Sequence, residues 1–231
     1  MRRPGIWAID KFWGADMRVY QLSRANYALL NLQRSRLKVS TFDDLNDPFE
    51  LLSASVPESS LRKALLAFKA DVHASLGILC FCTNWENPVM WSHYADKHRG
   101  VCLGFDIPDQ FAIPVRYIKD RQAVKYVDGI QSRGVEPSFA FELMCSKYNA
   151  WSYEKEVRMF VGLEESEEDS GYFFYPFGAE LTLREMILGH RCTVSASEVA
   201  TVLGDRVNSV SVSKARLAFN SFRVVTDQRS L

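Results

Sequence analysis

The amino-acid sequence predicts an α+β fold with a mixed, mostly antiparallel sheet, which could be split, and with helices flanking it. Segments with strand character outnumber helical ones, the two kinds do not alternate regularly, and there is no internal repeat. Regular alternation would instead predict a doubly wound parallel sheet. The chain has 231 residues. We therefore expect an N-terminal arm over residues 1–16 and a single α+β domain over residues 17–231.

The composition is that of a folded globular protein. Basic and acidic residues balance at 28 each, so no global field draws the chain to nucleic acid or to an anionic membrane. No apolar run approaches the roughly 20 residues of a membrane span, and no secretory signal is evident. Five cysteines form no framework spacing, which favours a cytoplasmic setting. An aromatic share of 13% indicates either a stacking pocket or a core built from large rings.

The first elements follow from the local pattern. Residues 17–22 alternate as a strand, Ser23 is a fair helix cap, and residues 25–33 have apolar side chains at helical spacing. Residues 36–41 predict a second strand. A polar turn follows over residues 43–50, because proline there blocks continuation of the sheet.

The middle of the chain has two longer helical segments, at residues 57–75 and 137–148. A buried strand is expected at residues 77–83 and a further strand at residues 113–118. The remaining predictions are a strand at 154–163, an acidic turn or disordered tip at 164–170, a strand at 172–177, helix or strand at 183–188, a helix at 195–203, and closing strands at 207–212 and 215–225.

One stretch, residues 91–106, combines a short aromatic helix, a glycine turn and a buried strand. Gly100 can take a positive φ and end the helix, and Gly104 within a strand allows close approach of a backbone or a ligand. We interpret this stretch as the floor and one wall of a pocket. The helical half is crowded by Trp91, His93, Tyr94 and His98.

A second stretch carries charges at strand spacing. Glu154, Glu156 and Arg158 would share one face of a strand, because side chains two apart point the same way. Two carboxylates beside a guanidinium can stabilise a positive transition state or move a proton. The alternative is an exposed, salt-bridged strand face. Trp151 just upstream argues against this alternative, because a tryptophan is a poor choice for a solvated edge.

A third stretch holds Asn46, Asp47 and Glu50. Asn and Asp suit a tight turn through bonds to their own backbone, and that use is the simpler interpretation. The functional alternative is that Asn46 and Glu50 reach a ribose or orient a catalytic group.

A metal site is not favoured. Cys80 and Cys82 with His93 and His98 could bind zinc, but cysteines in so apolar a strand are usually core residues. The sequence has no glycine-rich phosphate-binding motif of the P-loop or Rossmann type, and no nucleophile elbow.

Four motifs together resemble the bacterial proteins grouped as domain of unknown function 2971. They are N-D-P-F-E at 46–50, W-S-H-Y-A-D-K-H-R-G-V-C-L-G-F at 91–105, W-S-Y-E-K-E-V-R at 151–158 and L-G-H-R at 188–191. The family has no settled activity, so this resemblance predicts the kind of chain rather than the reaction.

The opening strand–helix–strand is also similar to the start of ADP-ribosyltransferase-type domains. That resemblance implies a split antiparallel sheet around a cleft for NAD. It would place Tyr20 or Arg24 at the first site position and Tyr94 or Trp91 against the nicotinamide. Glu156 or Glu154 would be the late glutamate that contacts the ribose.

The resulting hypothesis is a nucleotide-binding protein that uses NAD as a substrate, with no tightly bound cofactor and no metal. ADP-ribose would pass to water or to a protein or nucleic-acid acceptor. The catalytic candidates are Glu156, Glu154 and Arg158. The substrate-binding candidates are Tyr20, Arg24, Asn46, Glu50, Trp91, His93, Tyr94 and Trp151. Two alternatives stay open: a nuclease or phosphoesterase that uses Asp47, Glu50, His93 and Glu156, and a non-catalytic module that recognises a partner or small molecule.

Overall fold

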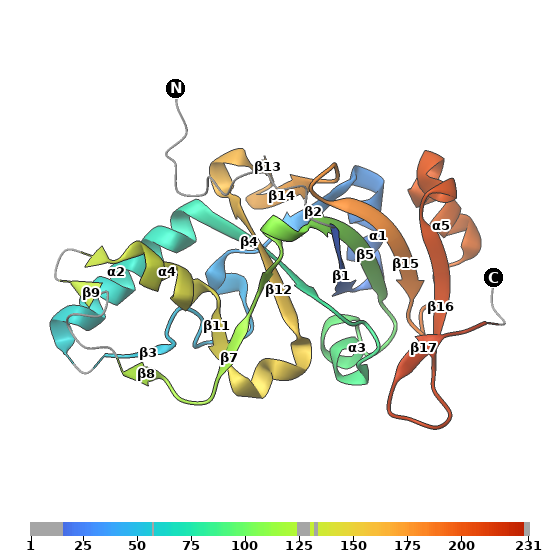
Figure 1. Cartoon of the computed structure of the whole chain (residues 1–231). Coiled ribbons are helices and arrows are strands. Elements are labelled where there is room, and N and C mark those ends of the chain that lie inside the picture. The colour runs from blue at the N-terminus through green and yellow to red at the C-terminus, as the bar shows by residue number, and fades with distance from the viewer. Residues whose placement is uncertain (1–15, 57, 124–129, 132–133, 229–231) are drawn as a thin grey trace.

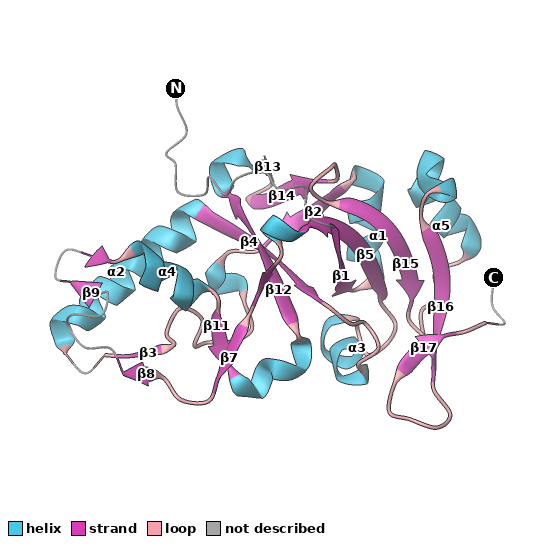
Figure 2. Ribbon diagram, in the orientation of Figure 1, coloured by secondary structure: helices cyan, strands magenta, loops and turns pink. Residues whose placement is uncertain are grey.

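The computed structural model describes residues 16–56, 58–123, 130–131 and 134–228. Its main feature is an eight-stranded sheet (Figures 1 and 2). In spatial order the strands are β17 (Val224–Thr226), β16 (Ser211–Leu217), β15 (Thr182–Leu188), β5 (Val101–Pro108), β1 (Asp16–Ser23), β4 (Leu76–Cys82), β12 (Glu156–Gly162) and β6 (Ile113–Pro114). Only β15 and β16 pair in parallel within this sheet. The predicted α+β class with a mixed, mostly antiparallel sheet is confirmed. The predicted N-terminal arm lies outside the described residues, except for Asp16, which begins β1.

The sheet opens between β1 and β4. β1 pairs with β5 over its whole length, but with β4 only where Tyr20 faces Cys82. β4 then diverges to form a bridge with Ser40, whose backbone nitrogen donates to the Ile78 carbonyl oxygen at 3.0 Å. The gap between the two strands is the place where a pocket can reach the interior.

A second, three-stranded sheet joins β13 (Glu167–Asp169), β14 (Tyr172–Pro176) and β2 (Arg36–Val39). The predicted acidic turn or tip at 164–170 is therefore partly wrong, since its second half is strand. The acidic side chains are tolerated because Arg36 forms ion pairs with Glu167 and Asp169.

Helices cover both faces of the large sheet (Figure 1). α1 (Ala25–Arg34) and α5 (Ala196–Leu203) pack on the face that carries Val19 and Leu103. α3 (Pro88–Tyr94) packs on the opposite face, where Trp91 and Leu22 are buried. A separate core forms between α2 (Ser59–Ser75), α4 (Pro137–Met144) and the outer part of β4.

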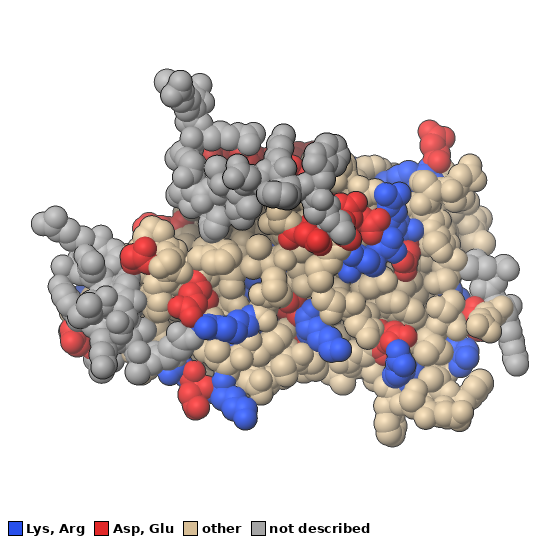
Figure 3. All heavy atoms as spheres, viewed as in Figure 1, with Lys and Arg blue, Asp and Glu red and all other residues tan. Residues whose placement is uncertain are grey.

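The remaining elements are short. The strands are β3 (Ala54–Ser55), β7 (Arg116–Ile118), β8 (Gln122–Ala123), β9 (Ile130–Gln131), β10 (Gly134–Val135) and β11 (Ser146–Tyr148), and the 3-10 helices are η1 (Phe42–Asp44), η2 (Asp109–Phe111), η3 (Asn149–Glu154), η4 (Leu163–Glu165) and η5 (Gly204–Asn208). No helix among the described residues combines the length and the apolar character that crossing a membrane requires. Basic and acidic side chains lie next to one another on the face in Figure 3.

Three predicted boundaries are wrong in ways that matter for the site. The helix expected at 137–148 ends at Met144, because the next residues pair in parallel with β7 as strand β11. The strand expected at 154–163 begins at Glu156, because Lys155 adopts a left-handed conformation with φ 46°. Arg24, rather than Ser23, caps α1.

The predictions for residues 183–188 and for the closing strands are resolved as strands, but with bounds that differ from those predicted. Residues 183–188, left open between helix and strand, lie in β15. The closing strands begin later than expected, because residues 204–208 form η5 before β16 starts at Ser211.

Gly100 is needed for a different reason than expected. It does not have a positive φ; Asp96, Lys97 and His98 turn the chain instead, and His98 therefore lies beyond the helix. A Cβ on Gly100 would lie 2.1 Å from the Ser23 carbonyl oxygen. At Gly104 the close approach is made by side chains rather than by a backbone or a ligand, since a Cβ there would lie 2.9 Å from the Cβ of Glu185 and 3.1 Å from the Tyr20 ring.

We predict that Gly100→Ala destabilises the fold by about 1–3 kcal/mol, because the added methyl group meets backbone that cannot move aside cheaply. Gly178→Ala is the matched control, since nothing lies within 4 Å of a Cβ there. Urea unfolding of the two variants measures the difference. Equal midpoints for both variants would contradict the close contact at Gly100.

Candidate functional site

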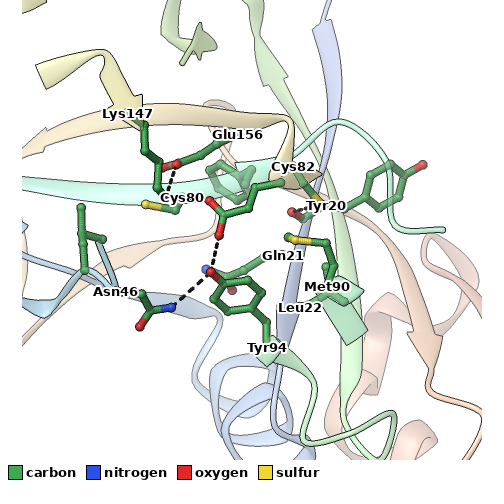
Figure 4. A pocket seen from close by; sticks show the side chains of 13 residues that line it. Tyr20, Gln21, Leu22, Asn46, Cys80, Cys82, Met90, Tyr94, Lys147 and Glu156 are labelled. Carbon is green, nitrogen blue, oxygen red and sulfur yellow. Dashed lines mark hydrogen bonds and ion pairs between the residues drawn. The ribbon is translucent and has the colours of Figure 1, made fainter. Parts of the chain in front are cut away.

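A pocket of about 100 Å³ lies in the gap between β1 and β4 (Figure 4). Strand residues form its floor, and side chains from α3, β11 and the loop after η1 form its walls. The lining residues are Tyr20, Gln21, Leu22, Leu45, Asn46, Cys80, Phe81, Cys82, Met90, Tyr94, Lys147, Glu154 and Glu156. The pocket thus joins residues far apart in the sequence.

Lys147 is the central cation of the site. Its ammonium nitrogen donates to Glu154 Oε2 at 2.6 Å and to Glu156 Oε2 at 2.8 Å. Only 7% of Lys147 is exposed. The two glutamates reach it by different routes, because Glu154 ends η3 while Glu156 begins β12. The left-handed Lys155 between them turns both carboxylates towards the same ammonium group.

Arg158 extends the charged chain into the interior. Its guanidinium donates to Glu156 Oε1 at 2.8 Å, to Glu50 Oε1 at 2.6 Å and to the Met144 carbonyl oxygen at 2.6 Å. Charges of opposite sign therefore alternate from Glu50 through Arg158, Glu156 and Lys147 to Glu154, and all are buried. Burying such groups is costly unless each has a partner. We call these five side chains the buried ion chain.

The outer end of the buried ion chain reaches the pocket at Tyr94. The Tyr94 hydroxyl donates to Glu154 Oε1, and Asn46 Nδ2 donates to the Tyr94 hydroxyl oxygen at 3.2 Å (Figure 4). The expected turn bond is present, since Asp47 Oδ1 accepts a bond from the Phe49 backbone nitrogen at 2.9 Å. Glu154 is thus a fixed carboxylate at the pocket wall, with a phenol beside it.

The ion chain sets the protonation states around it. Burial alone would raise the pKa of Glu156, but Arg158 and Lys147 outweigh it and hold that pKa below its usual value. Burial would lower the pKa of Lys147, but Glu156 and Glu154 raise it above its usual value. Lys147 and Glu156 are therefore both charged at neutral pH.

Burial raises the pKa of three other groups at the site, Glu50, Tyr94 and Cys80. Burial raises the pKa of Glu50, and Arg158 only partly offsets this. Its second oxygen, Oε2, is buried with no hydrogen-bond partner among the described residues. Burial and the bond to Glu154 raise the pKa of Tyr94, so its hydroxyl stays a proton donor. Burial also raises the pKa of Cys80, so that thiol is not a ready nucleophile.

The structure brings together six residues that the sequence singles out: Asn46, Glu50, Tyr94, Glu154, Glu156 and Arg158. Tyr20 lines the pocket, although its ring points away from Glu156 (Figure 4). Trp151 is next to the site rather than in it, with Lys147 Nζ 5.3 Å from its ring centroid.

Three other candidates lie elsewhere. Trp91 is fully buried on the core side of α3, and its indole nitrogen donates to the Trp85 carbonyl oxygen at 2.6 Å. His93 is exposed, with its ring 6.3 Å from that of Tyr153. Arg24 is exposed at the start of α1 and does not line the pocket. The sequence offered Tyr94 or Trp91 as the ring that contacts a ligand. Of these two, Tyr94 lines the pocket and Trp91 does not.

Sequence reasoning missed Lys147, which it placed in a helix. The signal that could have identified it is a lysine that directly follows the mostly apolar run at residues 139–145 and one serine, just before the acidic motif. Within the described residues, no three His, Cys, Asp or Glu side chains gather as a metal site would require.

Comparison with protein families gives a match over part of the chain. Residues 90–159 match the model described as "Protein of unknown function (DUF2971)". This match supports the family resemblance that the motifs carry. It covers less than half of the chain, but it includes Tyr94, Lys147, Glu154, Glu156 and Arg158. Comparisons with curated proteins and with solved structures gave no match.

We predict opposite pH behaviour for two glutamine variants. The folded pKa of Glu156 is depressed, so its stabilising effect is complete above the unfolded value of about 4.3 and is lost as the pH falls through the folded pKa. Glu156→Gln should cost at least about 2 kcal/mol at pH 7, and the gap to the unsubstituted protein should narrow below about pH 4.

Glu50→Gln is the matched variant within the same ion chain. Since the folded pKa of Glu50 is raised, its ionised form costs stability above that pKa, and the amide should be tolerated better at pH 7. Denaturant unfolding between pH 3 and pH 7 measures both variants. A larger loss at neutral pH for Glu50→Gln than for Glu156→Gln would contradict this assignment of charges.

Proposed function

We propose that the pocket binds a nucleotide, with NAD as the substrate, and that the protein transfers ADP-ribose to water or to an acceptor. The observation that carries the proposal is the contact of Tyr94 with Glu154 at the pocket wall. It holds a carboxylate in a fixed position beside a ring and a space that is open to solvent.

The proposed reaction starts at the bond between nicotinamide and ribose. That bond breaks with its electron pair going to the nicotinamide nitrogen, and the ribose becomes a positive oxocarbenium ion. Glu154 would accept a hydrogen bond from a ribose hydroxyl and stabilise this charge. Water, or a nucleophile of the acceptor, then adds to the ribose carbon and loses a proton to solvent.

The buried ion chain suits Glu154 to this role. Each of its carboxylate oxygens makes one contact, to Tyr94 or to Lys147, and an ionised carboxylate can accept more than one hydrogen bond at each oxygen. Glu156 is different, because it accepts three hydrogen bonds from Lys147 and Arg158, two of them at Oε2. Within this proposal Glu154 contacts substrate, whereas Glu156 and Arg158 act as positioning residues through Lys147.

The sheet supports the proposal through its shape. An antiparallel sheet that opens beside its first strand is what the resemblance to ADP-ribosyltransferase-type domains implies. Here the opening lies between β1, which carries Tyr20, and β4. The late glutamates follow at the end of η3 and at the start of β12, the strand next to β4. This expectation comes from the opening of the sequence alone, so function still depends on the site itself.

Recognition without turnover is the second candidate function. It is favoured by the mutual pairing of the buried charges, because a fully paired set of charges is also what a rigid binding wall requires. This alternative predicts binding of a nucleotide or another small molecule with no chemical change.

The test is incubation of purified protein with NAD, with nicotinamide release followed by chromatography. We expect release by the unsubstituted protein and a loss of about 100-fold or more in Glu154→Gln, since its amide carries no charge to stabilise the oxocarbenium ion. Tyr94→Phe, which keeps the ring, should lose less.

Glu168→Gln is the control, because Glu168 is exposed on β13, and thermal unfolding checks that each variant is folded. Calorimetry with NAD runs alongside. Heat of binding without nicotinamide release would favour recognition, and equal release by Glu154→Gln and the unsubstituted protein would refute the role of Glu154.

A further inference from the structure

A larger groove of about 580 Å³ continues from the pocket. Six residues line both spaces: Gln21, Leu22, Leu45, Asn46, Cys80 and Tyr94. The groove therefore leads directly to the wall where Tyr94 meets Glu154. Its size lies within the range of ordinary small-molecule sites, about 300–1,000 Å³.

The groove runs between a helix and the smaller sheet. Tyr27, Leu30 and Asn31 lie on one face of α1, as their spacing requires. The opposite wall comes from β2 and β14, where Phe174 lies across from Lys38 in register and Tyr172 lies two residues away on the same face. Two elements remote in the sequence thus present aromatic rings to one space.

The aromatic rings of this groove are available to a ligand. Tyr27 and Tyr172 are each 54% exposed, although both line a concave surface. Single exposed aromatic residues are ordinary, but two in one groove next to a charged pocket are not explained by packing. Flat faces of this kind stack with nucleobases whatever their sequence.

The polar groups of the groove fit the rest of a nucleotide. Lys38 Nζ lies 4.5 Å from the centroid of the Tyr172 ring and makes no salt bridge among the described residues. Its charge could bind a phosphate. Asp44 uses one carboxylate oxygen to accept a bond from the Thr41 backbone nitrogen at 3.2 Å, so the other can accept from a sugar hydroxyl.

We propose that this groove is the base-binding subsite of the protein, which takes the purine base of a nucleoside monophosphate unit against Tyr27 and Tyr172, with its phosphate beside Lys38. The inference rests on the proposed function only in placing this unit as the adenylate half of NAD. The other half of the dinucleotide then extends past Asn46 towards Glu154.

The experiment is isothermal titration calorimetry with three probes: AMP, adenosine and ribose 5-phosphate. AMP should bind, adenosine should bind more weakly because it lacks the phosphate, and ribose 5-phosphate should bind weakest because it lacks the base. Tyr172→Ala should weaken AMP binding by about tenfold. Lys38→Met should weaken AMP binding but leave adenosine unchanged.

The control is Phe222→Ala, which removes an aromatic ring that is 100% exposed outside the groove. AMP affinities that match in Tyr172→Ala, Tyr27→Ala and Phe222→Ala would overturn the subsite. So would equal binding of AMP and ribose 5-phosphate, since that would mean that the protein recognises no base.

The titrations, together with the nicotinamide-release assay, separate this inference from the proposed reaction. AMP binding that depends on Tyr172 without nicotinamide release from NAD would leave the subsite in place and reject the reaction. Nicotinamide release with a KM for NAD unchanged in Tyr172→Ala and Tyr27→Ala would do the opposite.

Discussion

The ammonium group of Lys147, shared between Glu154 and Glu156, is the interaction on which the site depends. It is buried, as are both of its partners. Without it Glu154 would lose its ion pair, and Glu156 would keep only the one with Arg158. Arg158 has the same role deeper in the interior, between Glu156 and Glu50. Loss of either cation would leave a buried negative charge uncompensated, which typically costs about 3–5 kcal/mol. The ion chain therefore fixes η3, β11, β12 and the turn at Glu50 relative to one another.

The pocket exists because the sheet is incomplete at this point. A continuous sheet would pair Gln21 and Leu22 with β4, but β4 turns away to bridge Ser40. The backbone gap is bordered by Asn46 and Tyr94 instead of by another strand. The ion chain makes one wall of this gap rigid and polar, while β1 and α3 supply a mostly apolar one. A rigid carboxylate beside an accessible space is the arrangement that catalysis by electrostatic stabilisation needs.

Local sequence patterns predict the main strands and part of the candidate site. Alternation predicted the main strands, and spacing by two correctly placed Glu156 and Arg158 on one face of β12. Glu154 reaches Lys147, as Glu156 does, but not by that spacing, because a left-handed Lys155 separates it from the strand. The sequence could not distinguish Trp91 from Tyr94, since both lie on one short helix and only packing shows which ring is buried. Lys147 was missed because the strand that carries it forms by pairing with the distant β7, which no local pattern reveals.

The most direct measurement is a crystal structure of the protein with ADP-ribose bound. Our account predicts density for the sugar next to the pocket within hydrogen-bonding distance of Glu154, the adenine against Tyr172, and Lys147 still between its two glutamates. Ligand density remote from Tyr94 and Glu154, or a pocket left empty at saturating ligand, would contradict it.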